Sequence, residues 1–263
     1  MNKQSYTFSH AICRLPARSL ISGLRAVDTG EPSYDQFVKD HKDYVSALKN
    51  TGAKVIILEA LEGFPDSVFV EDAALCLPKL AIIMRPGAPS RLGEAQAIKP
   101  ALEKLYTNVM QINGPGFIEG GDILVTEKEI LVGLSERTNI EGVEELNLIV
   151  SPFGYKLRVV DTPDGVLHFK TDCSLLDENT ILSTKRLANS GCFEGYSIIY
   201  VAEGEEACAN TIRFNDSIIM PSGFPRTYKK LISNNYTVKT IGNTEAAKLD
   251  GGMSCLSLRF TPF

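Results

Sequence analysis

Five similar segments follow one another at a nearly constant spacing along this chain, and each opens with a polar residue. The opening residues are separated by 47, 49, 42 and 45 positions and are Asp72, Glu119, His168, Asn210 and Cys255. Each of the first four segments continues with an apolar run, a turn, a second apolar run and a loop that carries an arginine, at Arg91, Arg137, Arg186 and Arg226. A fixed period of this size indicates a solenoid or a closed ring of repeated units.

The fifth segment is shorter, because the sequence ends at Phe263, soon after Cys255. We expect the N-terminal part of the chain to supply its missing helix and strand, from an amphipathic pattern at 35–49 and an apolar run at 53–60. An open solenoid would need capping repeats, whereas a ring closed in this way would not. We therefore predict an α/β ring of five units forming one catalytic domain, residues 1–263. An ordinary mixed α/β sandwich is the alternative.

Short β-branched runs predict the strands of the units, and helical patterns fall between them. Weaker helical patterns cover 92–106, 140–151 and 225–234. The run at 67–76 is interrupted by Glu71 and Asp72, although acids are disfavoured in strands.

Composition excludes several classes of function. A net charge of −5 without a basic cluster argues against nucleic-acid binding, and no apolar run reaches the 18 residues of a membrane span. The N-terminus lacks a signal-peptide profile and the six cysteines have no CxxC spacing, so we expect a cytoplasmic protein with reduced thiols. Three histidines without zinc-ligand spacing, and no phosphate-binding motif, predict neither a metal nor another cofactor.

A closed ring would bring the opening residues of its units together at one end. Cys255 and His168 would then form the nucleophile and acid/base pair of a thiol enzyme. Cys255 lies in LDGGMSCLSLRF, where the glycines leave backbone room for a substrate. Each residue taken alone is more often structural. Glu119, within FIEGGDIL, is expected to orient His168 or to accept a hydrogen bond from the substrate.

The charges expected near this pair point to a zwitterionic amino acid with a cationic tail. Asp66, Glu71 and Asp72 are suited to a cation, since a guanidinium donates paired hydrogen bonds to carboxylates. Arg91 and Arg137 are suited to a substrate carboxylate, although a surface position is as common for arginine. The polar stretch 17–30 is expected to form a loop, either a lid over the site or an inert surface loop.

Seven motifs occur in order: PDSVFVED, RPGAPSR, EGGD, GLSERTN, LHFKT, MPSGFPRT and DGGMSCLSLRF. This ordered set resembles the dimethylarginine dimethylaminohydrolases of the guanidino-modifying (pentein) superfamily, from about Ala11 to Phe260. The resemblance implies a five-bladed α/β propeller, in agreement with the predicted ring. It also implies hydrolysis of Nω-methylated arginines to citrulline and methylamines through a covalent cysteine thiouronium.

The resemblance also implies a role for each candidate residue. Cys255 corresponds to the nucleophile, His168 to the general acid/base and Glu119 to the acid beside the histidine. The expected substrate contacts are Asp72 with Glu71 for the guanidinium, Asp66 with the carbonyl groups of Leu24 and Leu249 for the α-ammonium, and Arg91 with Arg137 for the α-carboxylate. Leu24 would lie on the lid.

Three other functions remain open from the sequence. An arginine deiminase-type hydrolase would accept unmethylated arginine, an amidinotransferase would pass the amidino group to an amine, and a non-catalytic propeller would bind a macromolecule. The expected partner is a small-molecule substrate, with neither nucleic acid nor membrane, and the protein is expected to be a monomer or a homodimer.

Overall fold

The computed structural model describes residues 5–262, which contain five three-stranded sheets. In one sheet, β3 (Ala74–Leu77) pairs antiparallel with β4 (Leu80–Ile83). Helix α2 (Leu92–Glu103) then crosses over, and β5 (Val109–Gln111) pairs parallel with β4. The crossover follows from the parallel pairing, which a tight hairpin cannot make.

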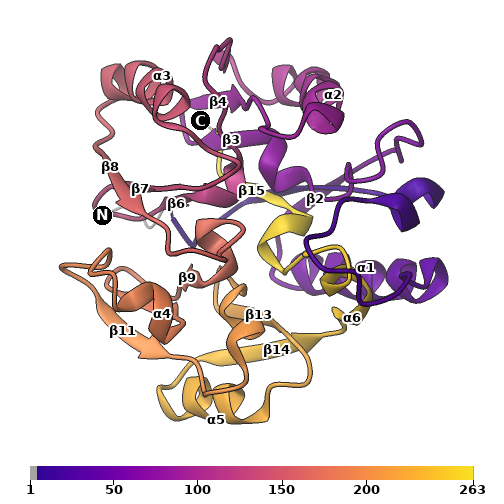
Figure 1. Ribbon diagram of the computed structural model, residues 1–263, viewed down its shortest axis with the longest axis vertical. Helices are drawn as coiled ribbons and strands as arrows, with labels where there is room; N and C mark the ends of the chain where they lie inside the picture. The colour runs from indigo at the N-terminus through magenta and orange to yellow at the C-terminus, as the bar shows by residue number, and fades with distance from the viewer. Residues whose placement is uncertain (1–4, 263) are drawn as a thin grey trace.

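The same order of strand, strand, helix and strand recurs in three more sheets. Their elements are β6 (Ile123–Val125), β7 (Ile130–Leu134), α3 (Ile140–Val150) and β8 (Leu157–Asp161); β9 (Cys173–Leu175), β10 (Thr180–Ser183), α4 (Lys185–Ala188) and β11 (Ser197–Tyr200); and β12 (Ile212–Phe214), β13 (Ser217–Pro221), α5 (Pro225–Ser233) and β14 (Thr237–Ile241). Figure 1 shows β3 and β9 toward the middle of the molecule and the helices α2, α3 and α5 at its outside. The helices predicted at 92–106, 140–151 and 225–234 are confirmed, whereas the one-turn helix α4 was not predicted.

The fifth sheet joins the two ends of the chain. Its strand order is β15 (Leu258–Phe260), β1 (His10–Arg14) and β2 (Lys54–Leu58), with α1 (Tyr34–Lys49) between the last two. The predicted N-terminal helix and strand are confirmed. The N-terminal segment also supplies the middle strand β1, so the C-terminal segment contributes one strand only.

Each sheet contains one strand that follows directly on a 3-10 turn, and these strands are β3, β6, β9, β12 and β15. The turns are η2 (Val70–Ala73), η4 (Gly120–Asp122), η6 (Phe169–Thr171), η7 (Glu206–Ala209) and η8 (Ser254–Leu256). Asp72 and Cys255 lie within their turns, Glu119 and His168 lie just before theirs, and Asn210 lies just after η7. The five opening residues are therefore neighbours of equivalent turns, but they are not strictly equivalent positions.

The expected continuous strand at 67–76 is wrong, because the chain turns at η2 before β3 begins. Glu71 and Asp72 are both buried in this turn. A buried carboxylate requires a charged or hydrogen-bonding partner. Glu71 finds its partners on other units, whereas Asp72 pairs with Arg91 of its own unit and accepts a hydrogen bond from Gly121 of the next.

The four loop arginines have a shared structural role. Each lies within ion-pair distance of a carboxylate from its own unit, and the pairs are Arg91–Asp72, Arg137–Glu119, Arg186–Asp172 and Arg226–Glu205. This pairing accounts for the recurrence of arginine in the repeat.

Apolar clusters between the sheets and the helices form the core. Helix α1, for example, buries Phe37, Tyr44 and Leu48 against the C-terminal region. Besides the helices already named, a short helix α6 (Thr244–Ala247) precedes η8. Within residues 5–262, no helix combines the length and the hydrophobicity that crossing a membrane requires.

Candidate active site

A small cavity of about 40 Å³ collects residues from several opening turns and from the loop at 23–30. Eight residues proposed from the sequence line it: Leu24, Asp66, Asp72, Arg91, Arg137, His168, Leu249 and Cys255. The structure therefore brings together side chains that are far apart in the sequence. Four further lining residues were missed by the sequence analysis: Phe69, Leu167, Asp250 and Gly251.

Cys255 is held by the bend on which it lies. The backbone N–H of Gly252 is 3.3 Å from its Sγ, and the side-chain amide of Asn210 is 3.8 Å away. A Cβ on Gly252 would lie 2.1 Å from the side chain of Asn210, so no larger residue fits there. A Cβ on Gly251 would likewise meet Phe69 at 2.4 Å. Both glycines thus give room to protein side chains, and Gly251 also lines the cavity, as the sequence suggested for the backbone beside Cys255.

The thiol of Cys255 is protonated at neutral pH in this arrangement. Burial, and then the charges of Glu71 and Asp72, raise its pKa to about 11, against weaker opposite effects of the Gly252 N–H and of Lys170. None of the other five cysteines, all within residues 5–262, lines the cavity. Cys255 therefore combines access to the cavity with a need for activation, since the thiolate is the nucleophile.

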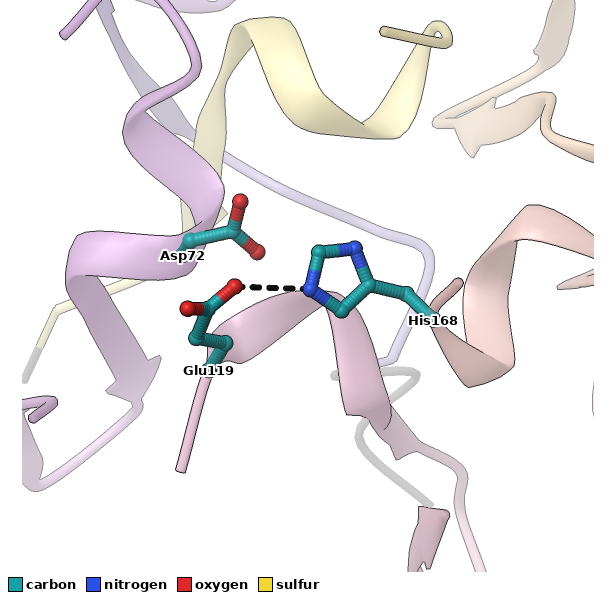
Figure 2. Close-up of side chains that lie close together, drawn as sticks. All are labelled: Asp72, Glu119 and His168. Atoms are coloured by element: carbon teal, nitrogen blue, oxygen red, sulfur yellow. Dashed lines mark hydrogen bonds and ion pairs between the residues drawn. The ribbon is translucent and has the colours of Figure 1, made fainter. Parts of the chain in front are cut away.

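His168 and Glu119 form a direct pair beside Asp72. Figure 2 shows the imidazole directed at the Glu119 carboxylate, with 2.7 Å between Nε2 of His168 and Oε2 of Glu119. Burial lowers the pKa of His168, but the carboxylates of Asp72, Asp122 and Glu119 outweigh it and raise the pKa to about 9. Burial likewise raises the pKa of Asp72, but His168 and Arg91 lower it to about 2. His168 is therefore a cation at neutral pH and can donate a proton.

Gly121 fits closely between Asp72 and His168. Its N–H donates to Oδ1 of Asp72 at 2.8 Å. A Cβ at this position would lie 2.8 Å from both that oxygen and the imidazole ring. Gly121 therefore lies against two candidate catalytic side chains, whereas a Cβ on Gly120 would meet the backbone carbonyl oxygen of Glu71.

Arg91 is buried and bound on several sides. Its Nη1 donates to Asp72 at 2.6 Å, its Nε to Glu94 at 2.6 Å and its Nη2 to the Phe69 carbonyl at 3.0 Å. Burial lowers the pKa of Arg91, but the surrounding carboxylates outweigh it and raise the pKa. Burial raises the pKa of Glu94 to about 7, against the effect of Arg91. The sequence analysis missed Glu94, whose only signal is its position three residues after Arg91 on a helix.

Arg137 is more accessible than Arg91. Its side chain is 21% exposed and its Nη1 lies 3.6 Å from Oε1 of Glu119. Glu119 does not line the cavity itself. It lies behind two residues that do, because its carboxylate contacts both His168 and Arg137. Arg137 therefore retains more capacity to bind an anion than Arg91 does.

Two carboxylates hold the loop at 23–30 over the cavity. The backbone N–H of Leu24 donates to Asp66 at 2.9 Å, and that of Ala26 donates to Asp250 at 2.5 Å. Burial raises the pKa of Asp66, against the effect of Arg91. Leu24 is 39% exposed, whereas Leu249 is buried. Asp66 and Asp250 thus attach the loop beside the cavity, and both hydrogen bonds would have to break for the loop to move away.

Glu71 does not join the other predicted substrate-binding residues. Its carboxylate binds Lys170, Arg259 and Ser254, and it lines a second cavity of about 310 Å³. The two cavities share no lining residue among the described positions. Glu71 and Asp72 are neighbours on the turn η2 but line different cavities, and the expected contact of Glu71 with a substrate stays a prediction.

Asp72, Glu119 and His168 could offer three ligand atoms within 4.8 Å of one another to a metal ion. However, Arg91 lies 2.6 Å from Asp72 and 4.0 Å from Glu119. A fixed positive charge at this distance opposes binding of a second cation. The carboxylates of Asp72 and Glu119 are better suited to the positively charged imidazolium of His168, which already lies beside them.

Comparison with known proteins identifies the family. A family model described as N,N dimethylarginine dimethylhydrolase, eukaryotic, matches residues 29–172. The N(G),N(G)-dimethylarginine dimethylaminohydrolase of Pseudomonas aeruginosa is 40% identical over 254 residues, covering 96% of this chain and 100% of that protein. The chain belongs to the dimethylarginine dimethylaminohydrolase family. A family member from Streptomyces coelicolor is 31% identical, over 95% of this chain and 96% of the relative.

Solved structures agree with this family and with its fold. The Pseudomonas aeruginosa enzyme in a cysteine-to-serine form, complexed with citrulline, superposes with a TM-score of 0.94 at 39% identity, covering 97% of this chain and 100% of that chain. The N-terminal domain of ArgZ, an arginine dihydrolase from cyanobacteria, has a TM-score of 0.86 at 21% identity, over 96% of this chain and 98% of that domain. The latter likeness shows the fold alone.

Proposed function

We propose that this protein hydrolyses Nω-methylated L-arginines to L-citrulline and a methylamine, without a cofactor. The observation that carries the proposal is the meeting of Cys255 with His168 in one cavity that also presents carboxylates and arginines. A related enzyme of the family, 39% identical to this chain, has been crystallised with citrulline, which supports the product.

The charges of the cavity suggest how the substrate lies. Asp72 holds the guanidinium beside Cys255, while Arg91 and Arg137 bind the α-carboxylate. Asp66, with the carbonyl groups of Leu24 and Leu249, binds the α-ammonium. A cavity of about 40 Å³ has room for only a few water molecules, so the loop at 23–30 must move to admit a methylarginine.

The chemistry begins with the thiol. A bound guanidinium adds positive charge beside Cys255 and lowers its pKa, so substrate binding favours release of the thiol proton to solvent. The thiolate attacks the guanidinium carbon and forms a C–S bond. His168, already protonated, gives its proton to the amine nitrogen as the C–N bond breaks, and the methylamine leaves.

The second half of the reaction returns the enzyme to its starting state. His168 accepts a proton from water as the water oxygen attacks the thiouronium carbon. The C–S bond then breaks and its electron pair returns to sulfur, which takes up the remaining hydroxyl proton as the carbonyl group of citrulline forms, so citrulline leaves and Cys255 is again a thiol. Glu119 keeps the imidazole oriented during both proton transfers, in which a small misplacement has a large effect on the rate.

We further propose that residues 1–263 form one catalytic domain, a five-bladed propeller closed by the sheet that joins both chain ends. Side-chain to backbone bonds between neighbouring turns support the closure, among them Asp72 with Gly121, Asp122 with Phe169 and Asn210 with Ser254. All six cysteines, each within residues 5–262, are free thiols, which supports a cytoplasmic location. We propose a monomer or a homodimer that acts on a small molecule and binds neither nucleic acid nor membrane.

The test is product analysis with asymmetric dimethylarginine as substrate. We expect equal amounts of citrulline and dimethylamine from the wild-type protein and neither from Cys255→Ser. Amidino transfer to an added amine, or the absence of citrulline with every methylated arginine, would refute the proposal.

A further inference from the structure

Asn210 opens the fourth unit of the repeat and has no part in the reaction proposed above. It is buried, and it lies just after the turn η7. Its side chain reaches the turn η8 of the fifth unit in two places. Oδ1 accepts a hydrogen bond of 2.9 Å from the backbone N–H of Ser254, and Nδ2 lies 3.8 Å from Sγ of Cys255, a hydrogen-bonding distance to sulfur. One amide therefore contacts both the nucleophile and the residue before it.

The first of these contacts fixes the direction of the second. The Ser254 N–H needs an oxygen acceptor, so the carbonyl end of the Asn210 amide faces Ser254 and the NH2 group faces the sulfur. Gly252 leaves the space that the amide fills, because a Cβ there would lie 2.1 Å from Cγ and 2.3 Å from Nδ2 of Asn210. The missing side chain at position 252 is thus what allows the Asn210 amide to reach Cys255.

Two uncharged N–H groups therefore converge on one sulfur atom. The second belongs to the backbone of Gly252, at 3.3 Å from Sγ. The charged side chains with the strongest effect on Cys255 are Glu71 and Asp72 of η2 and Lys170 of η6. The other charged residues that line the cavity are Asp66, Arg91, Arg137, His168 and Asp250.

We propose that Asn210 is a catalytic residue, whose side-chain amide acts with the Gly252 N–H to hold the sulfur of Cys255 as a thiolate. This inference rests on the proposed function and adds a group to it. It also gives the fourth opening residue of the repeat a role in the site that the other four opening residues form.

The sulfur carries negative charge at two points in the proposed reaction. It does so before it attacks the guanidinium carbon, and again as the C–S bond breaks and the electron pair returns to sulfur. An N–H group binds an ionised acceptor about twice as strongly as a neutral one. Asn210 therefore stabilises both charged states relative to the neutral sulfur of the thiol and of the thiouronium.

A neutral donor suits this position better than a cation does. A lysine beside Cys255 would also favour the thiolate, but it would repel the guanidinium that has to bind next to the sulfur. The amide of Asn210 donates a hydrogen bond and adds no net charge. It therefore favours the thiolate and leaves the cavity suited to a cationic substrate.

The test is the pH profile of labelling by chloroacetamidine, a cationic haloamidine whose reaction with the thiol needs no turnover. The Cys255 thiolate forms a C–S bond with its methylene carbon as chloride leaves, so the labelling rate rises with pH and then reaches a plateau. The midpoint of the rise reports the pKa of Cys255 beside a cation, and the plateau reports the reactivity of the thiolate itself. The profile is measured on full-length wild type and on Asn210→Ala.

In Asn210→Ala we expect the midpoint to rise by about one pH unit, the effect of losing one hydrogen bond to a charged group. The plateau should stay within about threefold of the wild type, because a thiolate of higher pKa is the stronger nucleophile. A side chain that only held the turn would act in the opposite way, since its loss would lower the plateau and leave the midpoint in place. With methylarginine, kcat should fall about tenfold while KM changes less than about threefold.

Asn215→Ala is the matched control. Asn215 lies in the same unit, and both ends of its amide are also used: it accepts from the Phe8 N–H at 2.7 Å and donates to the Phe8 carbonyl oxygen at 3.1 Å. It lines neither of the two cavities. We expect this variant to lose stability but to keep the wild-type midpoint, plateau and kcat.

A raised midpoint in Asn210→Ala, with an unchanged control, supports the proposal. It is overturned if the midpoint is unmoved in the folded variant, or if the control shifts it as far. Where Asn210→Ala does not fold, Asn210→Asp decides, because it keeps an oxygen acceptor for Ser254 and replaces the donor with a carboxylate oxygen; a midpoint that does not rise would overturn the proposal. Failure of the wild type to produce citrulline would refute the proposed function, whereas the labelling profile would still report on Asn210.

Discussion

The protonation state of His168 depends on Asp72, and Asp72→Asn should convert the imidazolium into a neutral imidazole near pH 7. Asp72 is the foremost of the carboxylates that raise the pKa of His168 to about 9. Asparagine keeps the size of the side chain and can still accept the Gly121 hydrogen bond. The substitution therefore removes a charge with little change of shape.

The distance between the two groups sets the size of the effect. The nearest nitrogen of His168 and oxygen of Asp72 lie within 4.8 Å of each other. At an effective dielectric constant of about 20, two unit charges at that distance interact by about 3.5 kcal/mol. This energy corresponds to about 2.5 pKa units, so the pKa of His168 in Asp72→Asn should fall to about 6.5.

Nitrogen-15 NMR titration of the histidine side chains measures this change. The other two histidines serve as internal controls, since burial lowers the pKa of His10 and brings that of His41 to about 4. Wild-type protein should show one histidine still charged at pH 8, and Asp72→Asn should show none. An unchanged raised pKa in the variant, or a wild-type His168 already neutral at pH 7, would refute this electrostatic account.

The same shift predicts how stability depends on pH. The folded pKa of His168 exceeds the value of about 6.5 expected in the unfolded chain. Its contribution to the free energy of unfolding is therefore complete below about pH 6.5 and is lost as the pH rises through 9. Urea denaturation at pH 6 and pH 9.5 should show a smaller difference for Asp72→Asn than for the wild type, and an equal difference would contradict the assignment.

Three further substitutions test other parts of the site. Cys255→Ser should reduce kcat on the order of 10⁴-fold or more and abolish labelling by a haloamidine; labelling that persists at another cysteine with loss of activity would contradict this. Arg137→Ala should raise KM about 10- to 100-fold for methylarginine but not for its decarboxylated analogue, while Arg186→Ala, a loop arginine away from the cavity, should not. Gly121→Ala should destabilise the fold by about 1–3 kcal/mol and reduce kcat, because its Cβ would meet Asp72 and His168; wild-type kinetics would show that the site can relax.

The sequence predicted the fold through its period, because every unit has the same turn before its first strand and four of the five have the same pairing of arginine with carboxylate. It did not predict β1, since HAICR is too short and too mixed to be recognised as a strand. The one-turn helix α4 was missed for a similar reason, because so few residues show no helical periodicity.

The candidate site was predictable wherever a motif defines a residue, as for Cys255 and His168, which do share a cavity. Side-chain direction was not predictable. Glu71 and Asp72 are adjacent acids, yet the turn η2 sends the Glu71 carboxylate to Lys170, Arg259 and Ser254 and that of Asp72 to the small cavity. The glycines at 251 and 252 were expected to give a substrate access; Gly251 does line the cavity, but both also make room for Phe69 and Asn210, and these contacts arise only in the folded chain.

The most direct test of the central claim is the ratio of kcat/KM for asymmetric dimethylarginine to kcat/KM for arginine. Methylation removes hydrogen-bond donors from one guanidinium nitrogen, so a site that binds both terminal nitrogens should reject the methylated substrate. We expect the ratio to exceed one by about tenfold or more, because Asp72, which we propose to bind the guanidinium, would engage only one of its terminal nitrogens. A kcat/KM for arginine equal to or above that for dimethylarginine would contradict the proposal and indicate an arginine deiminase.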